Sequence, residues 1–174
     1  MGPPVLCATI RAMDELIAQI RLAATAGLYY LALFGALSLP DICGALNSKE
    51  GTASASKYKD WLRNNVPEQA NDADVIYGLR CSLLHQGKAM PHGGVFPLAF
   101  TFPPGGQIHN LSTVVNGQQV GWLSIPLFVE EVTLGAERWL QQFGNTKRVK
   151  RNLEKFARLR PEGLPPHVQG PVIA

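Results

Sequence analysis

The side chains best suited to chemistry lie on a helix predicted between Asp74 and Gln86. Arg80 and His85 stand five positions apart on this helix. A histidine titrates near neutrality and can transfer protons, which typically contributes about 10²–10⁴-fold to a rate. A guanidinium donates hydrogen bonds in a planar fork that matches phosphate oxygens. The pair therefore suits cleavage of RNA by its own 2′-hydroxyl, which needs proton transfer and positive charge at the phosphate.

The predicted helix has two apolar strips rather than one. At about 100° per residue, the residues of its core face share one third of the circumference, namely Val75, Ile76, Leu79 and Leu83. Tyr77, Cys81 and Leu84 form a second strip on the opposite side, with Arg80 and His85 at its two margins. On a straight helix those margins point about 140° apart, so one chain is expected to converge them poorly. A two-fold homodimer through the second strip would bring them around one groove.

The run from Leu79 to His85, LRCSLLH, contains Arg-x4-His on a bundle helix and resembles the HEPN superfamily. The resemblance implies an up-and-down helical bundle that forms a homodimer, in which the arginine and histidine of two subunits meet. It also implies a metal-independent endoribonuclease or RNA-binding protein of a toxin–antitoxin or defence type, with RNA as substrate and an antitoxin as partner. Arg80 would stabilise phosphate charge, His85 would act as general acid and base, and Cys81 would line the groove. The position of Cys81 is often asparagine or another polar residue in the family.

A second interpretation of the same helix is a non-catalytic homodimeric interaction module. Arg80 and His85 would then be polar anchors of an interface, and RNA would stay intact. No cofactor is predicted under either interpretation. No metal site is predicted either, because no carboxylate or cysteine stands at ligand spacing from His85, His92 or His109.

The segment from Lys147 to Arg160 is strongly basic. It carries seven basic residues against one glutamate, whereas the remaining chain carries nine basic and twelve acidic residues, so the segment is net +6 and the rest net −3. Such asymmetry is an electrostatic signature of nucleic-acid binding, although a solvated terminal helix would show it too. The candidate phosphate-binding residues are Lys147, Arg148, Lys150, Arg151, Lys155 and Arg158.

Length and composition predict one mainly α-helical domain over residues 1–160. The chain has 174 residues, of which 46% are hydrophobic and 17% charged. A stripe of apolar and small residues at helical spacing predicts one long first helix from Ile10 to Phe34, followed by a short helical piece at 39–46. Because this stripe begins in a charged region, a bundle helix is favoured over a membrane span at 22–40. We expect a cytoplasmic protein with no membrane segment and with reduced cysteines.

A small β insertion is predicted at about residues 95–125. Strands are expected at 96–102, 108–115 and 120–125, arranged as an antiparallel hairpin or meander. Asn116-Gly117 between two β-prone runs is the strongest hairpin signal. Pro126 then restarts the helical pattern, a last basic helix is expected at 146–159, and residues 161–174 form a proline-rich tail.

Overall fold

The computed structural model describes residues 5–89 and 98–174, with side chains described from Ala12 onward within these ranges. Six α-helices dominate this part of the chain, which confirms the mainly α prediction. They are α1 (Val5–Thr25), α2 (Tyr29–Leu46), α3 (Ala55–Asn65), α4 (Ala73–Gln86), α5 (Ile125–Phe143) and α6 (Lys147–Leu153), with a 3-10 turn, η1 (Pro67–Gln69), before α4.

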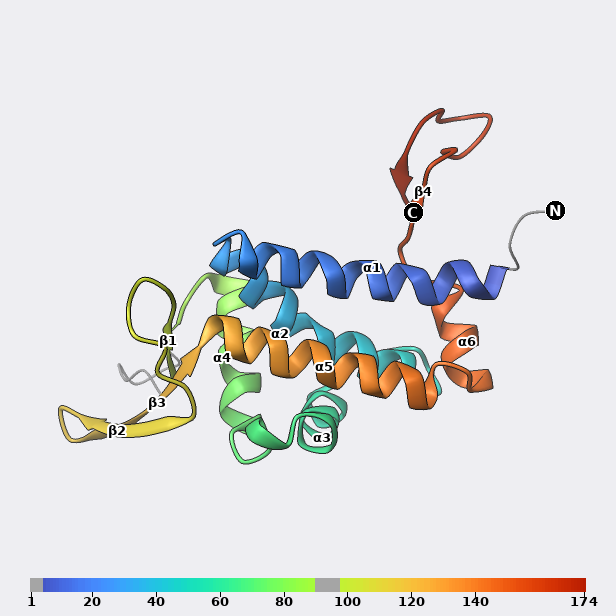
Figure 1. The fold of residues 1–174 in the computed structure, drawn as a ribbon. Coiled ribbons are helices and arrows are strands. Elements are labelled where there is room, and N and C mark those ends of the chain that lie inside the picture. The colour runs from blue at the N-terminus through green and yellow to red at the C-terminus, as the bar shows by residue number, and fades with distance from the viewer. Residues whose placement is uncertain (1–4, 90–97) are drawn as a thin grey trace.

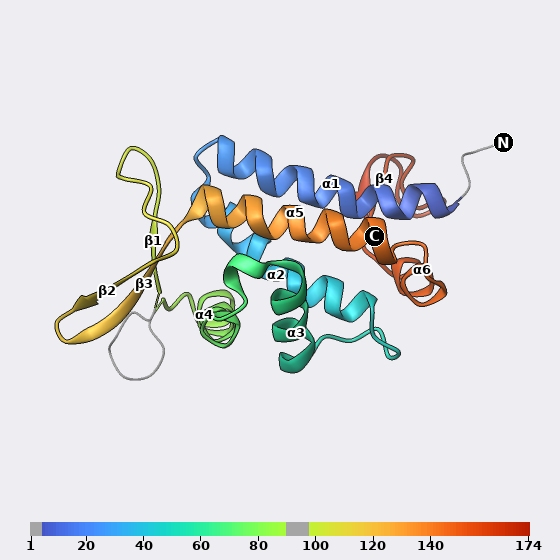
Figure 2. The ribbon, with the colours of Figure 1, turned by 60° about the horizontal axis from the view of Figure 1, so that its bottom comes forward.

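Three helices, α1, α2 and α5, run alongside one another and form the body of the molecule (Figure 1). Helices α3 and α4 pack on the α2 side of this body, and α6 covers the end opposite the sheet (Figure 2). The inner face of α5 is formed by Phe128, Val132 and Trp139, which are buried in the core. Arg21 of α1 adds ion pairs to Glu130 and Glu137 of α5, which join the two helices at the surface.

The prediction of one long first helix is wrong, because the chain turns at Gly27. This glycine has a φ of 75°, and the Leu28 amide donates to the Ala23 carbonyl at 2.8 Å, a typical C-terminal stop of a helix. The helical spacing of apolar residues is the same before and after Gly27, so this spacing gave no sign of a break. Leu31, which lies within the predicted long helix, is 61% exposed in α2.

The predicted short helix at 39–46 is also wrong, because α2 continues through Pro40. Proline removes one backbone hydrogen bond from a helix interior. Here its neighbours Leu37, Leu39 and Cys43 are fully buried, so packing outweighs the lost bond. By length and composition alone α2 is apolar enough to cross a membrane, with a mean hydropathy of 1.4, yet half of it is buried inside the bundle.

The β insertion is a three-stranded mixed sheet rather than an antiparallel one. Its strands β1 (Leu98–Thr101), β2 (Leu111–Val115) and β3 (Gln118–Ser124) have the spatial order β1-β3-β2. β2 pairs antiparallel with β3 as predicted, but β1 pairs parallel with β3. β3 takes the centre because it carries Val120 and Leu123 into the core. The predicted strand at 108–115 begins only at Leu111, since Asn110 adopts a positive φ of 52°.

The hairpin turn at Asn116-Gly117 is confirmed. Both residues have positive φ, 52° and 78°, as a primed two-residue turn requires. We expect Gly117→Val to destabilise the hairpin by about 1–3 kcal/mol, because a β-branched residue is strained at positive φ. Helical circular dichroism should be retained while the β2–β3 amides lose hydrogen-exchange protection.

Gly106→Val is the matched control for this prediction. An added Cβ meets no atom within 4 Å at either glycine, but Gly106 does not adopt a positive φ. The control should therefore leave the β2–β3 amides protected. Loss of the helical signal in Gly117→Val would mean that the sheet is needed for the whole fold.

The chain after α6 turns back on itself. The basic helix ends at Leu153 rather than near 159, and β4 (Leu159–Arg160) pairs antiparallel with β5 (Val172–Ile173). Asn152 of α6 is buried and donates to the Leu46 and Ser48 carbonyls at 2.9 and 2.8 Å. This amide satisfies carbonyls that the end of α2 leaves open, and so fixes α6 to the bundle.

Candidate functional site

Helix α4 carries the two predicted catalytic residues and is firmly placed. Three residues of its predicted core face, Ile76, Leu79 and Leu83, are buried, and Val75 is half-buried. The helix ends at Gln86 as predicted, and Gly87 follows with a φ of 63° and an amide that donates to the Leu83 carbonyl. At the other end Asp74 pairs with Lys59 and Arg63 of α3, at 2.7 and 2.5 Å. The backbone of α4, which carries Arg80 and His85, is therefore held in place at both ends of the helix.

Arg80 and His85 meet within a single chain. Arg80 Nη1 lies 3.0 Å from His85 Nε2. The expectation that one chain converges them poorly is therefore wrong. The helical wheel gives only the directions of the Cβ atoms, whereas the long arginine side chain reaches across one turn of the helix to the imidazole.

The contact has a definite hydrogen-bond direction. A guanidinium has only donors, so Arg80 donates and His85 Nε2 accepts. His85 itself is exposed at the surface.

Asp41 of α2 completes the arrangement. Its Oδ2 atom lies 2.6 Å from Arg80 Nη2, and the two side chains are only 14% and 20% exposed. Arg80 is thus held between a carboxylate and an imidazole by its two terminal nitrogens. No motif in the sequence points to Asp41 for this role. Its one signal is isolation, since it is the only charged residue of the 18-residue helix α2.

The electrostatics of this ion pair are unusual. Burial raises the pKa of Asp41 above its ordinary value, and this effect outweighs the lowering by Arg80. Burial is the largest effect on Arg80 and opposes its charge, but the negative charge of Asp41 and the contact with Cys81 together outweigh it and raise the pKa of the guanidinium. Arg80 therefore stays charged, whereas burial disfavours the charged form of Asp41. Shifted pKa values in a mostly buried charged pair are more common at functional sites than in ordinary surface pairs.

The second apolar strip of α4 is only partly free. Tyr77 packs against Tyr58 of α3, with ring centroids 5.2 Å apart, and Lys59 lies over its ring at 5.4 Å. Cys81 and Leu84 are half-buried, and Cys81 Sγ lies 4.0 Å from Arg80 Nη1. Hydrogen bonding with Cys81, and then burial, raises the pKa of Tyr77. Of the three predicted interface residues, Tyr77 is therefore engaged inside its own chain, whereas Cys81 and Leu84 border Arg80.

The basic segment does not join the Arg80–His85 site. Both views show α6 at one end of the bundle and α4 toward the other, with α3 between them (Figures 1 and 2). Arg148 and Arg151 donate to the carbonyls of Asn47 and Lys49, and so hold the chain after α2. Lys147 and Lys155 are exposed, whereas Lys150 and Arg158 are half-buried.

His109 lies in a different environment from His85. Its Nδ1 accepts from the Ser124 amide at 3.1 Å, and its Nε2 lies 2.7 Å from Glu131 Oε1. These contacts join the loop between β1 and β2 to the end of β3 and to α5. Within residues 12–89 and 98–174, no three His, Cys, Asp or Glu side chains are placed to share a metal ion, and His92 lies outside these residues.

Comparison with known proteins adds no identification. No protein-family model, curated protein or solved structure matches the chain at a significant level.

Proposed function

We propose that this protein is a HEPN-like, metal-independent endoribonuclease or RNA-binding protein of a toxin or defence type. The observation that carries the proposal is the 3.0 Å contact between Arg80 and His85 on α4, with Arg80 held by Asp41. A proton-transfer group and a phosphate-binding group stand side by side there. The exposure of His85 makes the pair reachable by a polymer substrate.

The chemistry requires only these groups and the 2′-hydroxyl of the substrate. Arg80 turns its remaining N–H groups to the non-bridging oxygens of the reacting phosphate and stabilises the charge that builds up there. His85, released from Arg80 and neutral, accepts the proton of the 2′-hydroxyl or, once protonated, supplies one to the leaving oxygen. Asp41 keeps the guanidinium oriented throughout. The products are a 2′,3′-cyclic phosphate and a free 5′-hydroxyl.

The proposal includes a homodimer built on the Cys81 and Leu84 side of α4. Leu84 is half-buried and lies outside the hydrophobic core cluster of the described residues. We expect light scattering to return twice the 18.9 kDa of one chain at micromolar concentration. Leu84→Glu should give single chains with unchanged helicity, because a charge is then desolvated at the interface.

Leu134→Glu is the matched control for the dimer, since Leu134 is an exposed leucine on α5. It should leave the mass unchanged. A wild-type mass of one chain would rule out the dimer, and the site would then have to act within a single subunit, as its intrachain contact allows.

A functional test compares the wild type with the Arg80→Ala, His85→Ala double variant on total RNA. The wild type should fragment the RNA and the variant, once its helicity is verified, should not. The resemblance also implies an antitoxin partner, and co-expression with such a protein should suppress the fragmentation. Equal fragmentation by both proteins would mean that another site, or a contaminant, cleaves the RNA.

The alternative is a non-catalytic homodimeric module that uses the same face of α4. It is favoured by the double engagement of Arg80, whose two terminal nitrogens already contact Asp41 and His85. Cys81, in place of the polar residue frequent in the family, points the same way. RNA binding without fragmentation in the wild type would select an inactive RNA-binding form, and neither binding nor fragmentation would select the interaction module.

A further inference from the structure

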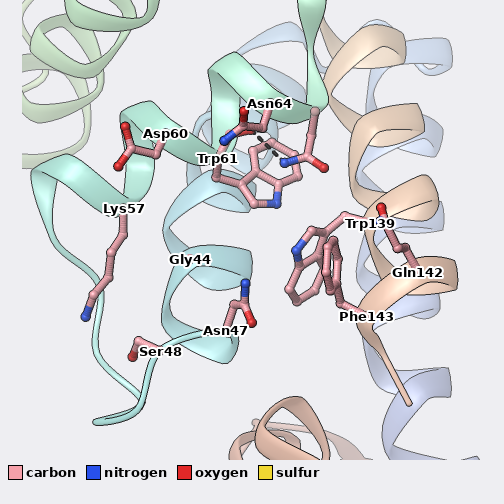
Figure 3. Close-up of a pocket in the computed structure, with 11 residues that line it drawn as sticks. Gly44, Asn47, Ser48, Lys57, Asp60, Trp61, Asn64, Trp139, Gln142 and Phe143 are labelled. Carbon is pink, nitrogen blue, oxygen red and sulfur yellow. Dashed lines mark hydrogen bonds between the residues drawn. The ribbon is translucent and has the colours of Figure 1, made fainter. Parts of the chain in front are cut away.

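A cavity separate from the Arg80–His85 pair lies between the end of α2, helix α3 and the end of α5. Its volume is about 500 Å³, within the usual range of small-molecule sites. Figure 3 shows Trp61 of α3 and Trp139 of α5 on its walls, with Asn47, the residue after α2, below them. Tyr58, on another face of α3, contacts Tyr77 of α4. Helix α3 therefore stands between the cavity and the Arg80–His85 site.

The walls of the cavity contain an unused hydrogen-bond donor. Trp61 is only 5% exposed, and its Nε1–H has no hydrogen-bond partner among the described residues. In Figure 3 the ring nitrogens of Trp61 and Trp139 lie on the side that faces the space above Asn47. A buried donor without a partner costs about 1–3 kcal/mol, so an acceptor that enters this space would recover that cost.

The remaining lining favours a flat ligand with a polar edge. Asn47, Asn64 and Gln142 line the cavity, and each presents a side-chain amide with both donors and an acceptor. Asparagine and glutamine amides match the hydrogen-bonding edges of nucleobases. Trp61 and Trp139 are 5% and 2% exposed, so they offer the cavity the edges of their rings. The combination of two indoles and three amides is thus suited to a nucleobase.

The position of the cavity agrees with such a ligand. Along the bundle the order is α4, then α3, then α6, in both views (Figures 1 and 2). Arg148 of the basic segment donates to the carbonyl of Asn47, which lines the cavity. Lys57, also in the lining, donates to the Thr52 carbonyl at 2.8 Å. Arg148 therefore places positive charge on the α6 side of the cavity, and Lys57 of α3 lines it together with the carboxylate of Asp60.

We propose that this cavity binds a nucleobase, seated beside the indole edges and hydrogen-bonded by Trp61 and the amides. Two sources carry this chemistry, a free nucleotide and an unstacked base of single-stranded RNA. The RNA source rests on the proposed function, because it makes the cavity a docking point for the strand that is cleaved at Arg80 and His85. It also gives the basic segment a role as a contact for the backbone of that strand.

Intrinsic tryptophan fluorescence tests base binding in the full-length chain, because two of its three tryptophans line the cavity. AMP, GMP, CMP and UMP are titrated separately, with ribose 5-phosphate as the ligand that lacks a base. We expect saturable quenching by at least one nucleotide and none by ribose 5-phosphate. Trp61→Phe keeps a ring and removes the donor, so it should weaken binding about three- to tenfold. Asn64→Ala, at an exposed position that leaves the core intact, should weaken it by a similar factor.

Trp122→Phe is the matched control. Trp122 lies on β3 and donates to Thr113 at 2.6 Å, so its loss should leave nucleotide affinity unchanged. Absence of saturable quenching with every nucleotide, equal binding of ribose 5-phosphate, or unchanged affinity in both Trp61→Phe and Asn64→Ala would overturn the proposal.

Two further binding measurements identify the source of the base and distinguish this proposal from the ribonuclease proposal. If the base comes from RNA, Asn64→Ala should weaken binding of a single-stranded RNA as well. If RNA affinity is unchanged while nucleotide affinity falls, the ligand is a free nucleotide. The Arg80→Ala, His85→Ala variant should bind nucleotides like the wild type. Nucleotide binding can therefore hold even where cleavage fails, and cleavage can hold where nucleotide binding fails.

Discussion

His85→Ala should lower RNA cleavage by about 10²–10⁴-fold, because the variant loses the group that moves protons at the 2′-hydroxyl and the leaving oxygen. RNA affinity should change little, since Arg80 and the basic residues remain. Single-turnover cleavage of a labelled RNA measures the first effect, and fluorescence anisotropy of the same RNA measures the second. The control is His167→Ala, which replaces an exposed histidine of the C-terminal segment.

Two outcomes would contradict this expectation. Cleavage retained in His85→Ala would show that His85 does not transfer the proton. A parallel loss of affinity and cleavage would mean that His85 holds the RNA or the dimer rather than acting on the bond.

Asp41→Asn should lower RNA cleavage without lowering the stability of the fold. We expect RNA cleavage to fall on the order of tenfold to 100-fold, because the guanidinium loses the partner that orients it. We expect no loss of stability at pH 7. The raised pKa of Asp41 shows that folding penalises its carboxylate form.

The pH dependence follows from the direction of that pKa shift. Because the folded pKa of Asp41 is raised, its contribution to stability is complete below the unfolded pKa of about 3.9 and is lost as pH rises through the folded value. Asparagine does not ionise, so Asp41→Asn should escape this loss. Urea unfolding of both proteins at pH 3.5 and 7 measures the difference.

The companion variant Arg80→Ala should behave differently in the same measurement. It leaves the Asp41 carboxylate buried without its cation, and we expect it to lose about 1–3 kcal/mol at pH 7. If Asp41→Asn were as destabilised as Arg80→Ala, the ion pair would be a structural contact and the functional assignment of Asp41 would fail.

Local signals in the sequence were reliable where one residue type settles the backbone. Gly87 ends α4, Asn116-Gly117 forms the hairpin turn, and α5 begins beside Pro126, all as predicted. In each case the residue is suited to a particular φ or lacks an amide, and no distant contact is needed to decide its conformation.

Features that depend on distant contacts were missed. Gly27 breaks the first helix although the apolar stripe continues in phase, because two helices that bury similar faces can share one spacing. The parallel pairing of β1 with β3 was missed because alternation along a strand carries no information about the direction of its neighbour. The charged stretch at 146–159 indicated a longer helix than the seven residues of α6.

The candidate site likewise combines features that local sequence predicts with features that depend on distant contacts. Arg80 and His85 were selected from their types and spacing on one helix, but their direct contact depends on the reach of the arginine side chain. Asp41 lies 39 positions away in sequence, and its partner could not be read from α2 alone. The cavity between α3 and α5 joins Trp61 to Trp139, residues that no motif connects.

The most direct test of the Arg80–His85 site is cleavage of one defined RNA strand beside its 2′-O-methyl counterpart, in EDTA. The two strands share sequence, charge and stacking, but only the first has an attacking hydroxyl. We expect the wild type to cut the RNA strand to products ending in 2′,3′-cyclic phosphate and to leave the 2′-O-methyl strand intact. Arg80→Ala, His85→Ala should cut neither. Cleavage of the 2′-O-methyl strand, products ending in 3′-hydroxyl, or an intact RNA strand with the wild type would contradict this expectation.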